Sequence, residues 1–404
     1  MINEKSVSAP LNLTLYFVVL VVCSSRGLLE IFVSKSVAYS VQFIFICIII
    51  LYMWMLFPKK HKQEMQAIYL MVLTACVSML LSAINLKVSF ASIAAVSVVN
   101  LTNVLFLVFA IEILKSSKLI IINPDKLLSG FRILSIWVIS FSFAQYLGVI
   151  SFVGSYGFLE NSRLSGAFGS MQHLSIALAI LSTVSLALTL YRFKVIDLLV
   201  SFALVSTLII TFTRIGYFIF GVSIICYFIS LLSTGRITGL IKFSMPAVGF
   251  IVLVLTVGLI FYTDVVYDFF SRVAGININE TSNLERFRHW SNGVDQFISG
   301  IIIFSDVTGL ASQIPKSLFN ETSHHYENGH LQYLINFGVF FWLIVIYLYY
   351  KWFSLLPGNT LLKFLPISLL ISLFIYMFNE VAPIYVMYPL VSIIAVFMNA
   401  KNRV

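Results

Sequence analysis

Charged residues are scarce in this chain, and their scarcity excludes a water-soluble fold. Only 10% of the 404 residues are Asp, Glu, Lys or Arg, whereas 60% are hydrophobic. Soluble domains carry about 25% charged and about 45–50% apolar residues. The chain therefore has too few polar side chains to cover its apolar ones, and its surface is expected to face lipid.

Cysteine is also rare, and its placement excludes two further classes. Cys23, Cys47, Cys76 and Cys226 all lie in apolar runs, and no two form a C-x-x-C pair. Cysteines in such runs behave as small hydrophobic residues, so neither disulfides nor thiolate metal ligands are expected. The apolar run after Leu11 lacks a small-residue cleavage site, so it is expected to remain as a membrane anchor.

Long apolar runs take the place of the missing charge. Each is about 20 residues long, the length that a helix needs to cross a bilayer core of about 30 Å. The runs are continuous and do not alternate as the strands of a membrane β-barrel do. They predict an all-α integral membrane protein, a single domain over residues 1–404, with about twelve transmembrane helices. The expected spans are residues 13–32, 37–57, 66–86, 91–114, 131–150, 173–191, 195–213, 215–233, 243–263, 329–350, 362–379 and 384–400.

The lysines and arginines indicate which side each connection faces. With the N-terminus inside the cell, every inside connection is basic and most of the 25 Lys and Arg residues are inside. Both termini are then inside. Two long connections are outside: residues 151–172, and a large loop, residues 264–328, between the ninth and tenth spans. The net charge of +9 thus reflects topology, and no nucleic-acid partner is expected.

Two arginines in the outer connections stand out, because that side should be poor in positive charge. Arg163 lies in a stretch of small residues, 161–169, that lets backbone approach a ligand closely. Arg214 lies in the short turn 211–216. Guanidinium groups bind phosphate through paired donors, so both are candidate phosphate ligands. The alternatives are an interfacial anchor for Arg163 and contact with a lipid headgroup for Arg214.

Residues 284–298 have the spacing of an amphipathic helix with one apolar face. At about 100° per residue, Arg286 borders this face and Arg288 points away from it. Arg286 is therefore directed toward the membrane domain and Arg288 toward water, whereas Gly293 weakens the helix prediction. The apolar residues are Leu284, Phe287, Trp290, Val294, Phe297 and Ile298.

Acid and base groups cluster just before the tenth span. His324, His325, Glu327 and His330 are candidate general bases, because histidines and carboxylates accept protons near neutral pH. A zinc site is disfavoured, because the i, i+4 spacing of helical zinc ligands is absent. Loop histidines without a chemical role are the remaining alternative.

A few charged residues lie inside the apolar runs. Glu112, Asp197 and Glu380 lie near span ends, and Arg26 is one turn from Glu30. Intramembrane charges can mark transport paths. Because these are terminal or can pair, a structural role is favoured.

Taken in order, these motifs resemble the family of bacterial O-antigen polymerases (Wzy) and O-antigen ligases (WaaL). Arg163-Leu-Ser-Gly-Ala-Phe168 resembles the family's R-x-x-G-x-F, and Thr211-Phe-Thr-Arg-Ile-Gly216 resembles its T-x-S-R-G. Its loop arginine and tryptophan fall on Arg286 and Trp290, followed by Gly309. The motif H-N-x-Y-L-Q-x-L-x-E-x-G is matched at Asn328, Leu331, Gln332, Leu334 and Gly338.

The same alignment contains departures. The ligase histidine falls on Glu327, the tyrosine on His330 and the later glutamate on Asn336. The missing histidine favours a polymerase over a ligase and leaves the base open between Glu327 and its neighbours.

The resemblance implies a glycosyltransferase of the bacterial inner membrane, acting at its periplasmic face on glycans carried by undecaprenyl diphosphate. Arg214 and Arg286, then Arg163 and Arg288, would bind the diphosphate. Glu327 or His325 would act as base, with His324 and His330 as further candidates. Asn328, with His330, would orient the acceptor.

The resemblance implies neither a metal nor a nucleotide, because the diphosphate is already a good leaving group. The expected partners are membrane lipids, the lipid-linked oligosaccharide, a flippase and a chain-length regulator. Two alternatives stay open. One is an O-antigen ligase that transfers glycan to lipid A–core, and the other is a lipid-linked oligosaccharide flippase or transporter.

Overall fold

The computed structural model of the chain is helical wherever it is described. No β-strand occurs among the described residues, so the predicted all-α fold is confirmed for this part of the chain. The structure describes residues 24, 26–33, 35–56, 62–86, 90–116, 124–150, 164–168, 171–191, 194–211, 213–233, 288, 290–295, 297–298, 303–304, 328–356 and 387–401.

The helices coincide with the expected spans. Every span predicted between residues 37 and 233 corresponds to one helix, since a helix satisfies its backbone hydrogen bonds internally where water is absent. The spans predicted at 243–263 and 362–379 lie outside the described residues, as does the first part of the span predicted at 13–32, of which the structure describes α2. The helices are α2 (Arg26–Phe32), α3 (Lys35–Leu56), α4 (Lys62–Leu86), α5 (Phe90–Ser116), α6 (Pro124–Tyr146), the 3₁₀ turn η2 (Gly166–Phe168), α7 (Met171–Tyr191), α8 (Val195–Ile210), α9 (Arg214–Ser233), α15 (Gly329–Leu355) and α17 (Met387–Lys401).

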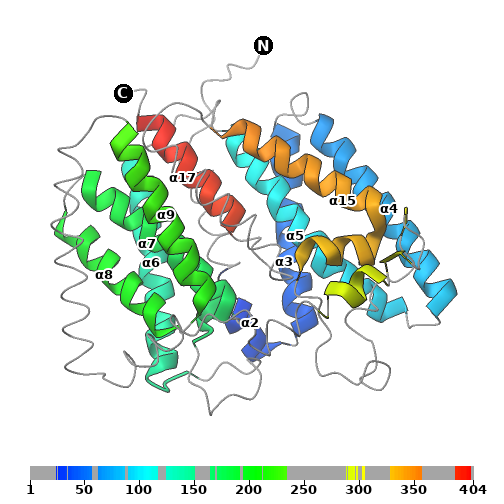
Figure 1. Ribbon diagram of the computed structural model, residues 1–404, viewed down its shortest axis with the longest axis horizontal. Helices are drawn as coiled ribbons and strands as arrows, with labels where there is room; N and C mark the ends of the chain where they lie inside the picture. Colours follow the sequence, from blue (N-terminus) through cyan, green and yellow to red (C-terminus); the bar gives the residue numbers. More distant parts are fainter. Residues whose placement is uncertain are drawn as a thin grey trace.

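The helices form two groups that α17 joins (Figure 1). In one group α7 packs against α8 and α9, and α6 packs against α8. In the other group α5 is central and contacts α3, α4 and α15. α17 contacts α5 from one group and α6 and α7 from the other, so it fixes the two groups relative to each other.

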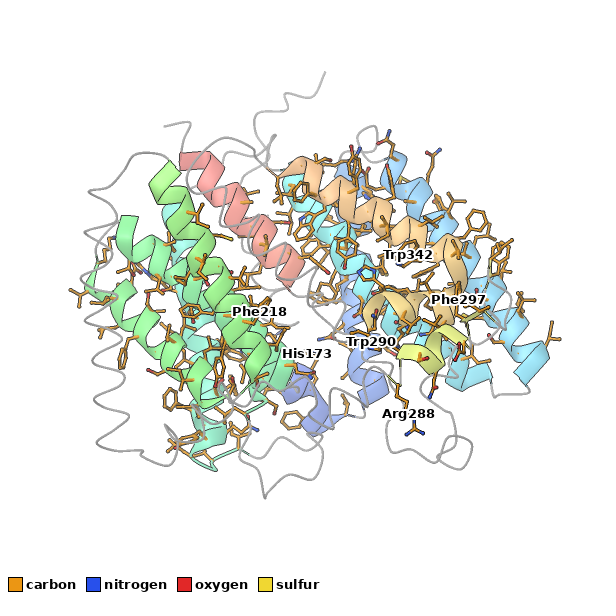
Figure 2. The ribbon with its side chains drawn as sticks, viewed as in Figure 1. His173, Phe218, Arg288, Trp290, Phe297 and Trp342 are labelled. Carbon is orange, nitrogen blue, oxygen red and sulfur yellow. The ribbon has the colours of Figure 1, made fainter. Side chains whose placement is uncertain are left out.

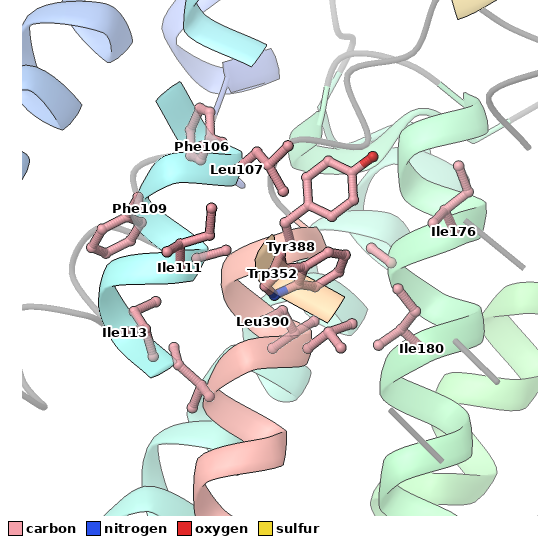
Figure 3. Packing of buried hydrophobic residues seen from close by; sticks show 14 of the residues in the cluster. Phe106, Leu107, Phe109, Ile111, Ile113, Ile176, Ile180, Trp352, Tyr388 and Leu390 are labelled. Atoms are coloured by element: carbon pink, nitrogen blue, oxygen red, sulfur yellow. The ribbon is translucent and has the colours of Figure 1, made fainter. Parts of the chain in front are cut away.

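Large apolar side chains fill the seam around α17 (Figure 3). Phe106 and Phe109 of α5, Ile180 of α7 and Trp352 of α15 are all fully buried there. The Trp352 indole Nε1 donates a hydrogen bond to the Ser392 Oγ at 2.9 Å, which satisfies its polar group inside the core. In lipid, an apolar side chain gains little free energy by moving from the acyl chains into the protein. Close packing of this kind therefore supplies much of the attraction between the helices.

The outward faces of α3 and α4 are apolar. Along α3, Val37, Val41, Ile44 and Ile48 recur every three or four residues and are 46%, 41%, 56% and 58% exposed. Ser78 of α4, in contrast, is buried. This arrangement is the reverse of a soluble helix bundle, whose exposed face is polar, and it fits contact with lipid.

By length and composition, helices in the described part of the chain can cross a membrane. They are Gln63–Ile84, Gln172–Thr189 and Gly329–Leu355. The count of about twelve spans and the orientation of the chain stay predictions.

Two ion pairs tie helices together. The Arg132 guanidinium on α6 donates two hydrogen bonds to the Asp197 carboxylate on α8, from Nε to Oδ1 at 2.7 Å and from Nη2 to Oδ2 at 2.9 Å. Lys115 on α5 pairs with Glu64 on α4. Asp197 is only 4% exposed, so the structural role expected for this carboxylate is confirmed.

We expect Asp197→Leu to lower the free energy of unfolding by about 2 kcal/mol, because it leaves the partly buried Arg132 without its counter-charge. The double variant Arg132→Met/Asp197→Leu should regain part of this loss, since no unpaired charge remains. Thermal unfolding in detergent measures both. A double variant no more stable than Asp197→Leu alone would contradict the pairing.

Candidate functional site

The candidate site residues divide between the described and undescribed parts of the chain. Arg288, Asn328 and His330 are described with their side chains, and Arg214 is the first residue of α9. The candidates outside the described residues are Arg163, Arg286, His324, His325 and Glu327. The end of the bundle where α7, α9 and α15 begin is called the site end below (Figure 1).

The segment that follows Arg163 is fixed to the end of α6. The Gln145 Oε1 accepts hydrogen bonds from the backbone N–H groups of Ser165 at 2.9 Å and Gly166 at 2.7 Å. The Gln145 Nε2 donates to the Ser165 Oγ at 3.2 Å. One glutamine thus satisfies the backbone of the turn, and residues 164–168 are buried.

Gly166 brings this segment against α7. Its φ is +53°, a left-handed conformation that suits glycine. A Cβ here would lie 3.1 Å from both the Leu174 Cδ1 and the Ser142 Oγ. The small residues of this stretch were expected to let backbone approach a ligand, but at Gly166 the close approach is to α6 and α7.

Gly216 brings the Arg214 turn against the same part of α7. A Cβ at Gly216 would lie 2.8 Å from the Ser175 Cβ and 2.8 Å from the Leu208 Cδ1, so only glycine allows this contact. The turn is closed by the Thr211 Oγ1, which donates to the Leu208 carbonyl at 2.7 Å. These contacts set the position at which α9, and with it Arg214, begins.

Leu174 and Ser175 are consecutive residues near the start of α7. Gly166 packs against one and Gly216 against the other. The segment after Arg163 and the turn that holds Arg214 therefore meet on one helical turn, although about 50 residues separate them in sequence. We call this arrangement the α7 junction.

The beginning of α15 is capped by Asn328. Its Oδ1 accepts a hydrogen bond from the Leu331 N–H at 3.0 Å, which satisfies one of the donors that a helix N-terminus leaves open. Asn328, which the resemblance predicts to orient the acceptor, thus sets where α15 starts.

His330 is buried, and its hydrogen bond fixes the state of its ring. The Trp342 Nε1 lies 3.2 Å from the His330 Nδ1. An indole N–H can only donate, so Nδ1 accepts and the neutral imidazole carries its proton on Nε2. In this geometry His330 is a hydrogen-bond donor through Nε2, and its basic nitrogen is occupied by Trp342.

Further polar groups are buried in the first half of α15. Gln332 is 6% exposed and Asn336 is fully buried. Tyr333 of α15 and Asn103 of α5 are buried as well. The site end therefore has a polar interior at α15 and α5.

α15 bends at Gly338, where φ is +83° and ψ is −179°. A Cβ at this position would lie 2.4 Å from the Ile303 carbonyl oxygen, so the position requires glycine. The Ser78 Oγ donates to the Phe337 carbonyl, a group next to the break, at 3.1 Å. Figure 1 shows the two halves of α15 running in clearly different directions.

A helix from the large loop packs under the first half of α15. Residues 288, 290–295 and 297–298 are helical, and we call this element the 288–298 helix. Trp290 and Phe297 pack against Leu331 and Ile335 of α15. Arg288 is exposed, as the helical spacing predicted.

The rest of that prediction was only partly right. Val294 and Ile298 were assigned to the face packed on the membrane domain, yet they are 43% and 63% exposed. Gly293, which seemed to weaken the helix, lies buried within it, between Trp290 and Phe297 in sequence. The packed face is therefore narrower than the apolar face.

Sequence reasoning did not single out Gln145 and His173. His173 is buried in the first turn of α7, beside the α7 junction, and Figure 2 shows it toward the same end of the molecule as Trp290 and Arg288. Both residues are polar and lie at the ends of apolar runs, and this placement was the available signal.

The described residues define a helical protein with helices long and apolar enough to span a membrane. No protein-family model, no curated protein and no solved structure matches the chain.

We expect Gly216→Ala to lower the free energy of unfolding by about 1–3 kcal/mol, because its Cβ overlaps Ser175 and Leu208. Gly221→Ala on the same helix is the matched control. It has nothing within 4 Å of its Cβ and should gain about 0.5–1 kcal/mol from higher helix propensity. Thermal unfolding of both variants checks the α7 junction, and equal shifts would contradict it.

Proposed function

We propose that the chain is an O-antigen polymerase, a glycosyltransferase that joins undecaprenyl-diphosphate-linked repeat units to elongate lipopolysaccharide O-antigen. The observation that carries the proposal is the α7 junction, where the segments adjoining two candidate phosphate ligands, Arg163 and Arg214, meet on one helical turn. The family is proposed from the four sequence motifs, which occur along the chain in the order that the family shows. The site end would face the periplasm of the bacterial inner membrane.

Arginines would hold the diphosphate of the donor. Arg214 is the first residue of α9, where the backbone N–H groups and the helix dipole also favour an anion. Arg286, Arg163 and Arg288 would add charge from the two outer loops. Guanidinium groups keep their charge and bind phosphate oxygens in pairs, so they can neutralise the charge that develops as the diphosphate leaves.

A base from residues 324–327 would activate the acceptor. Glu327, His325 or His324 would take the proton from an acceptor hydroxyl as its oxygen attacks the anomeric carbon of the donor glycan. The bond from that carbon to the diphosphate oxygen breaks, and the diphosphate takes the electron pair.

His330 and Asn328 would orient the acceptor. His330 offers a donor at Nε2, because its Nδ1 accepts from Trp342. The buried amide and hydroxyl groups of Gln332, Asn336 and Tyr333 lie on the same half-helix and suit a hydroxyl-rich ligand such as a sugar.

We expect Arg214→Ala and Arg286→Ala to shorten the O-antigen ladder, each reducing polymer by at least about tenfold, since one charged phosphate contact is worth about 1.5–3 kcal/mol. The measurement is a gel of lipopolysaccharide from a strain lacking its polymerase and expressing each variant at a matched level. Lys351→Ala is the control, because Lys351 binds Gln63 at the far end of α15. Normal ladders from both arginine variants would refute the assignment.

Loss of the whole protein separates the alternatives. Loss of a polymerase leaves single repeats on lipid A–core, whereas loss of a ligase leaves polymer on the lipid carrier. Purified protein incubated with lipid-linked repeats should yield longer lipid-linked products. Unchanged repeats would instead point to a flippase or transporter.

A further inference from the structure

Three exposed apolar residues lie around the site end without a role in the proposed reaction. Val294 and Ile298 on the 288–298 helix are 43% and 63% exposed, and Ile303 is 51% exposed. We call these three residues the apolar stripe. Large apolar side chains exposed to water are unfavourable, so the stripe requires an apolar partner.

The 288–298 helix has three distinct sides. Trp290 and Phe297 form the side docked on α15. Counting about 100° per residue from Trp290, Val294 and Ile298 lie about 40° and 80° around the helix, and Arg288 lies about 160° around it. The apolar stripe is thus between the docked side and the charged side, as in a helix that lies along a membrane surface.

One end of the apolar stripe, Ile303, adjoins the outward face of α15. Phe340 and Leu343 on this face are 51% and 50% exposed, at positions that a membrane-spanning helix turns toward lipid. The rings of Phe304 and Phe340 stack, with centroids 5.8 Å apart. Ile303 precedes Phe304, so Ile303 adjoins the outward face of α15. Val294 and Ile298 belong to the helix that Trp290 and Phe297 dock on the first half of α15.

The bend of α15 sets the depth of this surface. The part after Gly338, residues 339–355, is roughly 25 Å long at about 1.5 Å per residue, which is close to a bilayer core of about 30 Å. Gly338 therefore lies near one boundary of the membrane. Ile303, whose carbonyl oxygen lies against Gly338, is at the same level.

From these observations we propose that the apolar stripe is a lipid-docking surface, inserted among the acyl chains of the leaflet at the site end. Arg288 and Asp295, both exposed, then lie at the level of the headgroups or in water. The bilayer is chosen over a second copy of the chain because Ile303 adjoins the outward face of a helix long and apolar enough to span a membrane, and the 288–298 helix is docked on that same helix. The proposal does not depend on glycosyl transfer.

The test places one reporter at a time on the helix. Val294→Cys, Ile298→Cys, Arg288→Cys, Asp295→Cys and, as a lipid-facing reference, Leu343→Cys are made in full-length protein whose four native cysteines are replaced by alanine. Each is labelled with bimane, reconstituted into phosphatidylcholine–phosphatidylglycerol vesicles, and quenched with either brominated lipid or aqueous iodide. Only labelled proteins whose Tm is within about 2 °C of the unlabelled parent are compared.

Brominated lipid should quench positions 294 and 298 as strongly as 343 and at least twofold more than 288 and 295, with iodide showing the reverse order. Iodide quenching at 294 and 298 equal to that at 288 and 295 would place the stripe in water and overturn the proposal. Weak quenching by both agents would mean that protein, not lipid, covers the stripe, and would also overturn it. Oxygen and nickel accessibility of spin labels at the same positions gives an independent second measurement.

Discussion

Close packing of two glycines against one turn of α7 is the constraint on which the site end depends. In lipid, helices gain little from burying apolar surface, so backbones that approach closely supply much of the attraction. Gly216 allows that approach to Ser175, where a side chain would push α9 away from α7, and Gly166, with its positive φ, lets the turn after α6 pack on Leu174. Packing contacts therefore fix the positions of residues 164–168 and of the start of α9, independently of any ligand.

The hydrogen bond between His330 and Trp342 determines which ring nitrogen of His330 can donate a hydrogen bond. It joins residues on either side of the bend in α15 and holds one histidine neutral with a known tautomer. A ring fixed in this way donates a hydrogen bond with little reorganisation, which is what a positioning group needs. In the proposed reaction, proton transfer is assigned to the acid and base residues that precede Asn328.

Much of the helical fold could be predicted from the sequence, because apolar runs of about 20 residues leave little choice of secondary structure. The start of α6 was placed at residue 131, yet the helix begins at Pro124, since proline fits the first turn of a helix and polar residues are tolerated there. The Gln145 contacts, the bend at Gly338 and the residues on which Trp290 docks could not be predicted, because each depends on partners distant in sequence. Gly166, Gly216 and Gly338 were visible only as glycines in motifs, without the neighbours that require them.

The contact of Ile303 with Gly338 has a consequence for biogenesis. Residues 288–304 are synthesised before α15, and at that stage the break that receives the Ile303 carbonyl does not yet exist. The 288–298 helix also lacks its docking partners Leu331 and Ile335 until α15 is in place. The 288–298 helix can therefore dock only after α15 has been synthesised and has folded, so this part of the site end assembles late.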